Sequence, residues 1–217
     1  MANVSRRLIQ GPAGMLELRL DEPRAAQDVT RYCAVLCHPH PLYGGTLENK
    51  VVATLAHTYR DLGIPAVRFN FRGVGASAGE HDAGRGEVDD LLSVANWAAA
   101  HYGTDRLLVA GFSFGAVVAA AGADKLPLHH LILVAPPADR YGMEAINYFP
   151  CPVCVLIAEQ DEVVDAAAVR RWARQLSPPA TVLSFPEASH FFHGELVNLR
   201  QRVRTELCTA LPLVATE

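Results

Sequence analysis

Short apolar runs alternate with amphipathic helical segments along this sequence, and no other feature narrows the possible folds as much. The runs LLVAG, LILVA and VCVLIA are apolar almost without interruption, as expected of strands buried on both faces of a parallel sheet. We expect seven strands, at residues 15–20, 32–37, 66–71, 107–111, 131–135, 153–158 and 181–185. Helical spacing of apolar residues lies between them, at 52–62, 88–95, 169–176 and 196–207. The alternation predicts an α/β domain with a mostly parallel central sheet and helices on both faces.

The size and charge of the chain are those of one ordinary globular domain. Its 217 residues can form one core, and the sequence has neither an internal repeat nor a linker, so we expect a single domain over residues 1–217. The formal net charge is −4, and the Lys and Arg residues are scattered. This distribution argues against nucleic acid and against an anionic membrane as partners.

The cysteines and the N-terminal residues favour a cytoplasmic protein. The five cysteines are an odd number spread through apolar runs, and in a reducing compartment such residues pack as small buried hydrophobes. The N-terminal residues contain no more than a very short apolar run, whereas a signal peptide needs roughly seven or more apolar residues. No later run is long enough to span a membrane.

Ser113 lies in the strongest chemical motif of the chain, GFSFG at residues 111–115. The motif follows an apolar strand and precedes a helix of small residues at 116–123, which is the strand–turn–helix context of a nucleophile elbow. Such a turn strains the serine backbone, and side chains in place of Gly111 and Gly115 would collide with the neighbouring strand and helix. The motif therefore predicts Ser113 as a nucleophile.

A nucleophilic serine needs a base and an acid that orients the base, and both follow later strands of this sequence. Asp161 comes just after the strand at 153–158, and His190 lies on the loop after the last strand, before the final helix. Neutral imidazole can take the serine proton and return it to the leaving group. Three acids compete with Asp161: Glu159, Glu162 and Asp165. We interpret Glu162 and Asp165 as solvated or helix-capping acids, and His193 as a structural histidine.

Two backbone N–H groups should stabilise the oxyanion of a tetrahedral intermediate. One is expected from Phe114, directly after the nucleophile. The other should come from the loop after the strand at 32–37, which reads HPHPLYGG. Its prolines have no N–H, so the candidates are His40, Leu42 and Tyr43.

Three further patterns resemble metal or cofactor sites, and we interpret each as structural. His38 and His40 have no further ligand at a recognisable spacing. The run GVGASA at 73–78 resembles a dinucleotide fingerprint, but further glycines delay the helix that should begin there. Cys151 and Cys154 run into a strand and lack a second ligand pair. We therefore expect neither a metal nor a cofactor.

Taken together, several blocks of the sequence resemble a known family. The loop HPHPLYGG followed by NKVV, the run VRFNFRGVGASAG, the elbow GFSFG, and the segments EQDEVVD and SHFFHG look like the small, lidless bacterial serine hydrolases of the α/β-hydrolase superfamily, related to dienelactone hydrolases. The blocks extend from about residue 38 to residue 194. Unlike dienelactone hydrolases proper, this chain has serine at the elbow, which counts against lactone-specific chemistry.

The resemblance implies the α/β-hydrolase fold and a carboxylesterase-type activity on a small-molecule ester, with Ser113, Asp161 and His190 as the catalytic triad. A thioesterase or a peptidase could use the same triad. A protein of a different class, a non-catalytic interaction domain, could keep the same fold. The physiological substrate, the stereochemical preference and the oligomeric state do not follow from the sequence.

We expect no cap domain, because the segment in which one would be inserted is too short. A cap in this fold is usually inserted after the strand that follows the nucleophile helix, and here only residues 136–152 are available. A segment this short cannot bury a hydrophobic face of its own. The glycine-rich stretch at 75–86 is expected to be a mobile loop rather than an apolar roof. We therefore expect an open, shallow cleft that favours short acyl esters.

Overall fold

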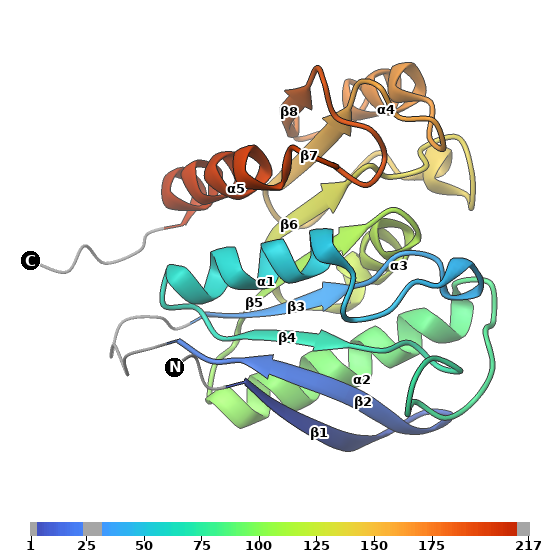
Figure 1. Ribbon diagram of the computed structural model, residues 1–217, viewed down its shortest axis with the longest axis vertical. Helices are drawn as coiled ribbons and strands as arrows, with labels where there is room; N and C mark the ends of the chain where they lie inside the picture. Colours follow the sequence, from blue (N-terminus) through green and yellow to red (C-terminus); the bar gives the residue numbers. More distant parts are fainter. Residues whose placement is uncertain (1–3, 24–31, 212–217) are drawn as a thin grey trace, which may run out of the picture.

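The computed structural model of the protein describes residues 4–23 and 32–211, so the expected domain over residues 1–217 extends beyond the described residues. An eight-stranded sheet runs through the molecule in the order β1-β2-β4-β3-β5-β6-β7-β8 (Figure 1). The strands are β1 (Val4–Gly11), β2 (Gly14–Asp21), β3 (Tyr32–Cys37), β4 (Ala66–Phe69), β5 (Arg106–Phe112), β6 (Leu128–Val134), β7 (Val153–Ala158) and β8 (Thr181–Phe185). Six strands, from β4 to β8 across the sheet, are parallel. Strand β2 pairs antiparallel with β4, and β1 pairs antiparallel with β2.

Helices cover both faces of this sheet, as the alternating pattern predicts. The longer helices are α1 (Lys50–Asp61), α2 (Arg85–Tyr102), α3 (Phe114–Gly122), α4 (Ala166–Ala173) and α5 (Leu196–Ala210). The apolar sides of α1 and α5 pack into one core, and those of α2, α3 and α4 into the other. The fold is therefore the α/β-hydrolase fold.

All seven predicted strands are present in the structure, but the first or last residue of several strands differs from the prediction, and one further strand was not predicted. Strands β3, β7 and β8 have the predicted bounds, whereas β4 ends two residues earlier than expected and β6 begins three residues earlier. Strand β1 was not predicted. Ile9 is its one buried residue among those whose burial is described, so β1 lacks the apolar run of the central strands. It is held by antiparallel pairing with β2 along its whole length.

The segment between β6 and β7 contains no cap domain, as expected. Its regular structure is one short 3-10 helix, η3 (Met143–Ala145). Trp172 of α4 donates its indole N–H to the carbonyl of Ile146 at 2.8 Å, and the Ser177 N–H donates to the carbonyl of Asn147 at 2.8 Å. These bonds hold the segment against α4. The segment between β6 and β7 therefore places no cap domain over the edge of the sheet where the parallel strands end.

The glycine-rich stretch at 75–86 is anchored, which corrects the expectation of a mobile loop. Glu87, at the start of α2, is fully buried and accepts the N–H groups of Asp82 and Gly84 at 2.9 and 2.8 Å. It also lies 2.7 Å from Nδ1 of His81. The Ala76 N–H donates to Glu17 at 2.9 Å. The buried carboxylate of Glu87 thus holds much of the loop in place through several contacts. The glycine content of the loop does not predict these contacts.

The cysteines are all free thiols. Four are buried as expected, but Cys208 on α5 is exposed. Cys151 packs in the core under α2, α3 and α4, whereas Cys154 packs in the core under α1 and α5. The sheet therefore separates the two residues that resemble a redox pair in the sequence. Burial raises the pKa of the Cys151 thiol to about 11, which leaves it protonated and unreactive. Among the described residues, no helix combines the length and hydropathy needed to cross a membrane.

Candidate active site

Ser113 occupies a sharp turn between β5 and α3, as the sequence motif predicts. Its backbone has φ 54° and ψ −118°, a combination that residues other than glycine seldom adopt. A side chain on Gly111 would overlap the backbone of Gly115 and Ala116 at the start of α3. One on Gly115 would overlap the carbonyls that end β3 and begin the next loop. The two glycines therefore let strand and helix approach closely enough to force the turn.

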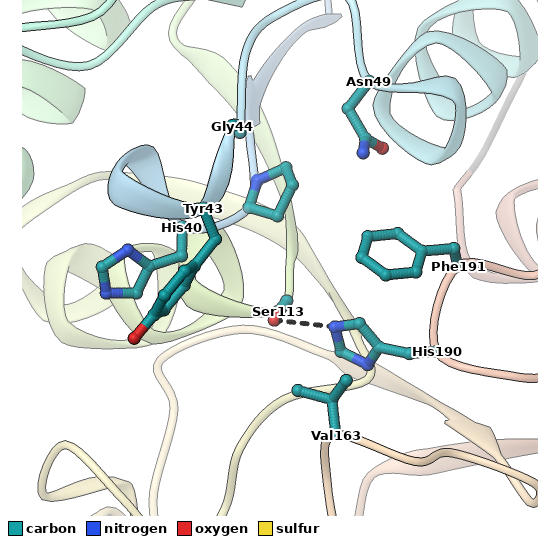
Figure 2. Close-up of a pocket in the computed structure, with 10 residues that line it drawn as sticks. His40, Tyr43, Gly44, Asn49, Ser113, Val163, His190 and Phe191 are labelled. Carbon is teal, nitrogen blue, oxygen red and sulfur yellow. Dashed lines mark hydrogen bonds between the residues drawn. The ribbon is translucent and has the colours of Figure 1, made fainter.

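The structure brings Ser113, His190 and Asp161 into one hydrogen-bonded row. Oγ of Ser113 is 3.0 Å from Nε2 of His190 (Figure 2). Nδ1 of His190 is 2.7 Å from Oδ2 of Asp161. Asp161 follows β7 and His190 follows β8, so the three residues come from the carboxyl ends of three parallel strands. These are the positions that the sequence indicates.

The contacts of Asp161 fix both its carboxylate and the tautomer of His190. Its Oδ1 accepts the N–H groups of Val163 and Val164 at 2.8 and 2.7 Å, which leaves Oδ2 for the imidazole. The side chains of His190 and Asp161 are only 3% and 2% exposed. An ionised carboxylate can only accept hydrogen bonds, so Nδ1 carries the ring hydrogen. The lone pair of Nε2 then faces the Ser113 hydroxyl.

The competing acids have other partners. Asp165 is the N-cap of α4 and accepts the Ala167 N–H at 2.8 Å, as expected of a helix-capping acid. Glu159 forms an ion pair with Arg170. Glu162 is exposed, but its Oε2 accepts the backbone N–H of His190 at 3.1 Å. That contact helps to position the His190 loop, and sequence reasoning missed it because the two residues lie on separate loops.

The neighbouring histidine, His193, is exposed and lies outside the row of hydrogen bonds. Its ring contacts the ring of Phe191, with the centroids 6.0 Å apart. His38, in contrast, is fully buried, and both of its ring nitrogens are engaged. Nδ1 is 2.6 Å from the carbonyl of Pro39, and Nε2 accepts the Phe71 N–H at 3.1 Å. Burial lowers the pKa of His38 to about 4, so the ring is neutral and fixes the loop after β3.

The loop after β3 begins with a short 3-10 helix, η1 (Pro41–Tyr43), and its hydrogen bonds distinguish the three candidate N–H groups. The Leu42 N–H donates to Nδ1 of His40 at 3.2 Å, and the Tyr43 N–H donates to the carbonyl of His40 at 3.1 Å. The N–H of His40 has no acceptor in the described part of the chain, nor does that of Phe114 at the start of α3. The His40 ring packs on the Phe114 ring, with the centroids 4.8 Å apart. Burial, and then the neighbouring His81, lower the pKa of His40.

A cavity of about 200 Å³ opens beside Ser113. One wall is the loop after β3, and the other is formed by Val163 and the segment at His190 (Figure 2). The ten lining residues are Pro39, His40, Tyr43, Gly44, Gly45, Asn49, Ser113, Val163, His190 and Phe191. All ten lie in the sequence blocks that carry the family resemblance, but sequence reasoning gave no role at the site to Asn49, Val163 or Phe191. The cavity faces Ser113 Oγ and is lined mainly by apolar atoms, an arrangement suited to holding a small organic group beside a nucleophile.

Comparison with known proteins places this geometry in a family. The model of the dienelactone hydrolase family matches residues 75–203. An uncharacterised protein of Rickettsia prowazekii, RP471, is 31% identical over 209 residues, which are 92% of this chain and 87% of that protein.

Solved structures give the same result. An α/β serine hydrolase homologue from Coxiella burnetii is 42% identical with a TM-score of 0.90, over 95% of this chain and 98% of the other. XC6422 from Xanthomonas campestris, a serine hydrolase without a lid, is 40% identical with a TM-score of 0.91, over 99% and 97% of the two chains. The chain therefore belongs to the dienelactone hydrolase family and is a hydrolase of the lidless α/β serine hydrolase type.

Proposed function

We propose that this protein is a serine carboxylic-ester hydrolase that acts on short-chain acyl esters through an acyl-serine intermediate. The observation that carries the proposal is the row from Ser113 Oγ to His190 Nε2 at 3.0 Å and from His190 Nδ1 to Asp161 Oδ2 at 2.7 Å. The row ends in a cavity that is open to a substrate. A row with this order and spacing is what acyl transfer to a serine requires.

The proposed reaction has two halves. As Ser113 Oγ attacks the ester carbonyl, Nε2 of His190 takes its proton, and Asp161 stabilises the imidazolium. The tetrahedral intermediate collapses to an acyl-serine, and His190 returns the proton to the leaving alcohol. Water then attacks the acyl group, with His190 again as the base, and the acid and free Ser113 are released.

For the oxyanion we propose the N–H groups of Phe114 and His40. Both lack an acceptor among the residues that the structure describes, whereas those of Leu42 and Tyr43 are already used by His40. The Phe114 N–H also lies at the first turn of α3, where the helix dipole favours negative charge. The side chain and carbonyl of His40 therefore hold the turn, and its own N–H is left for the substrate.

The proposed preference for short acyl chains rests on the size of the cavity. A cavity of about 150 Å³ can hold a molecule the size of benzene. About 200 Å³ beside Ser113 thus accommodates a group of several carbons. Each further methylene contributes about 0.8 kcal/mol only where protein covers it, and the segment between β6 and β7 forms no cover.

A fluorophosphonate probe tests the proposal. We expect one equivalent to attach to Ser113, located by mass spectrometry of the peptides, and hydrolysis of p-nitrophenyl butyrate to fall in proportion to labelling. Matched butyryl oxygen ester, thioester and anilide substrates then separate an esterase from a thioesterase or a peptidase by their kcat/KM values. A folded protein that neither reacts with the probe nor hydrolyses any of the three would be an interaction domain, and the proposal would be wrong.

A further inference from the structure

We propose that Asn49 is a specificity-determining residue, whose side-chain amide donates a hydrogen bond to an acceptor oxygen on the substrate. This inference rests on the proposed esterase function and narrows its substrate class. The favoured esters carry a carbonyl or similar acceptor oxygen on the substituent that fills the cavity. This oxygen is placed so that it reaches the Asn49 amide while the ester carbonyl lies at Ser113. Asn49 lines the same cavity as Ser113 and His190.

The hydrogen bonds of Asn49 fix which side of its amide faces the cavity. Asn49 is the N-cap of α1, and its Oδ1 accepts the N–H groups of Val51 and Val52 at 2.9 and 3.4 Å. The oxygen therefore faces the helix, and Nδ2 must face away from it. Figure 2 shows the amide group pointing into the space between Gly44 and Phe191. Within residues 4–23 and 32–211, no acceptor takes the Nδ2 hydrogens of Asn49.

The position of Asn49 is held by contacts on both sides of it in the chain. Its own N–H donates to the carbonyl of Thr46 at 3.0 Å, and its carbonyl accepts the Ala53 N–H at 2.8 Å. Two residues earlier, Leu47 is buried and its N–H donates to Oδ1 of Asn70 at 2.8 Å. The Leu47 carbonyl accepts from the buried guanidinium of Arg68 at 2.9 Å. A donor on so rigid a support recognises a substrate at little entropic cost.

The other polar side chains of the cavity are engaged or point elsewhere, and the backbone N–H of His40 is the one proposed above for the oxyanion. Ser113 and His190 bond to each other, and Nδ1 of His40 accepts from Leu42. The Tyr43 side chain is 86% exposed, and its hydroxyl points away from Asn49 (Figure 2). Pro39, Val163 and Phe191 supply apolar walls. Asn49 is thus the fixed donor that an entering substituent meets, and an apolar substituent would desolvate it without replacing its hydrogen bond.

Pairs of esters that differ only in an acceptor oxygen test the inference. In p-nitrophenyl isocaproate a methyl group replaces the ketone oxygen of p-nitrophenyl levulinate. The next two longer homologues of this pair move the ketone away from the scissile bond in single steps. The pair 4-oxopentyl acetate and 4-methylpentyl acetate places the same difference on the alcohol side. We expect kcat/KM of the ketone to exceed that of its apolar partner by about tenfold at one of these positions, the effect of one well-placed hydrogen bond.

The Asn49→Asp variant separates recognition from helix capping. Aspartate caps a helix as well as asparagine does, but when ionised it only accepts hydrogen bonds. We expect the ketone-to-methyl ratio of kcat/KM to fall to one or below, because the donor has become an acceptor. The matched control is Asp165→Asn, which makes the opposite exchange at the N-cap of α4, away from the cavity. That variant should keep the wild-type ratio.

Each outcome decides between the proposals. A wild-type ratio near one at every position overturns the role of Asn49 while leaving esterase function intact. So does a ratio that survives Asn49→Asp, or one that Asp165→Asn also abolishes. If the protein hydrolyses none of these esters, the esterase proposal is wrong, and the Asn49 inference falls with it.

Discussion

At Ser113, backbone conformation and chemistry depend on each other. A positive φ at a residue other than glycine costs about 1–3 kcal/mol, and it persists only where the surroundings enforce it. Here the enforcement comes from the close approach of α3 to β5 and β3, which the two glycines of the motif permit. The same turn lifts the hydroxyl towards His190 and leaves the Phe114 N–H without an acceptor among the residues that the structure describes.

Replacing Ser113 with alanine should lower kcat/KM for p-nitrophenyl butyrate by a factor of roughly 10⁶, because the proposed nucleophile is lost while the fold is kept. Steady-state kinetics on protein shown to be folded by circular dichroism measures this. Ser93→Ala is the matched control, since the Ser93 hydroxyl donates to the carbonyl of Asp89 within α2. Nearly full activity in Ser113→Ala would show that another group attacks the substrate.

The exchange of Asp161 for asparagine tests the acid separately. The amide can no longer hold His190 in the tautomer that presents a lone pair to Ser113, and we expect kcat to fall by about 10⁴. Asp165→Asn should leave kcat near the wild-type value, since asparagine also caps α4. If the two variants exchanged these results, the acid would have been assigned to the wrong residue.

Sequence could predict the proposed triad because its residues follow a motif and a chain order, whereas no pattern in the sequence indicates which residues of separate loops line one cavity. Asn49 and Phe191 lie far apart in the chain and meet only when the loops after β3 and β8 come together. In the loop after β3, sequence could exclude only the prolines and left three candidates for the second oxyanion N–H. The ring of His40 takes the Leu42 N–H through a side-chain contact that depends on the detailed turn, and nothing in the residue pattern encodes it.

At the scale of the elements, the strands that sequence predicts best are those whose burial dictates their composition. Strand β7 is buried at every position and reads VCVLIA, so periodicity alone identifies it. Strand β1 is an edge strand paired with β2, and its Leu8 is 53% exposed. Main-chain hydrogen bonds hold it in the sheet, and these depend little on side-chain identity. The order of the strands in the sheet depends on long-range packing and could not be read from the local pattern.

The loop after β3 is fixed to the end of β4 by a neutral histidine, and this predicts a pH dependence of stability. The unfolded chain binds a proton at His38 near pH 6.5, whereas the folded protein does so only near pH 4. Between these values the unfolded state holds more protons, so the free energy of unfolding falls as the pH falls. The loss attributable to His38 between pH 7 and pH 5 should be about 2 kcal/mol.

Urea unfolding of wild type and His38→Asn at both pH values measures this contribution. The variant should be less stable at pH 7, because it cannot reproduce both ring contacts, but should lose less stability on acidification. His129→Asn is the matched control, since it makes the same exchange at an exposed histidine. Parallel losses in wild type and His38→Asn would show that His38 does not stay neutral in the fold.

At the scale of the whole molecule, the decisive feature is that loops, and no cap domain among the described residues, lie at the edge where the parallel strands end (Figure 1). A longer acyl chain leaves the cavity beside Ser113 and meets water, so added methylenes contribute no further binding energy. Among p-nitrophenyl esters, we therefore expect kcat/KM to peak between acetyl and hexanoyl chains and to decline beyond them. Activity should not rise when the substrate forms an interface, since no lid has to open. Faster hydrolysis of the palmitate than of the butyrate would reveal a cover over the site.

The three residues of the proposed triad lie far apart in the sequence, so activity depends on how much of the sheet has formed during folding. Ser113 follows β5, but Asp161 and His190 follow β7 and β8, which add to the sheet beyond β6. Under the proposed mechanism, a chain that has folded only as far as β6 holds a serine in a strained turn with no base to activate it. Turnover during refolding should therefore begin late and abruptly, when β7 and β8 dock, and its time course would report the completion of the sheet.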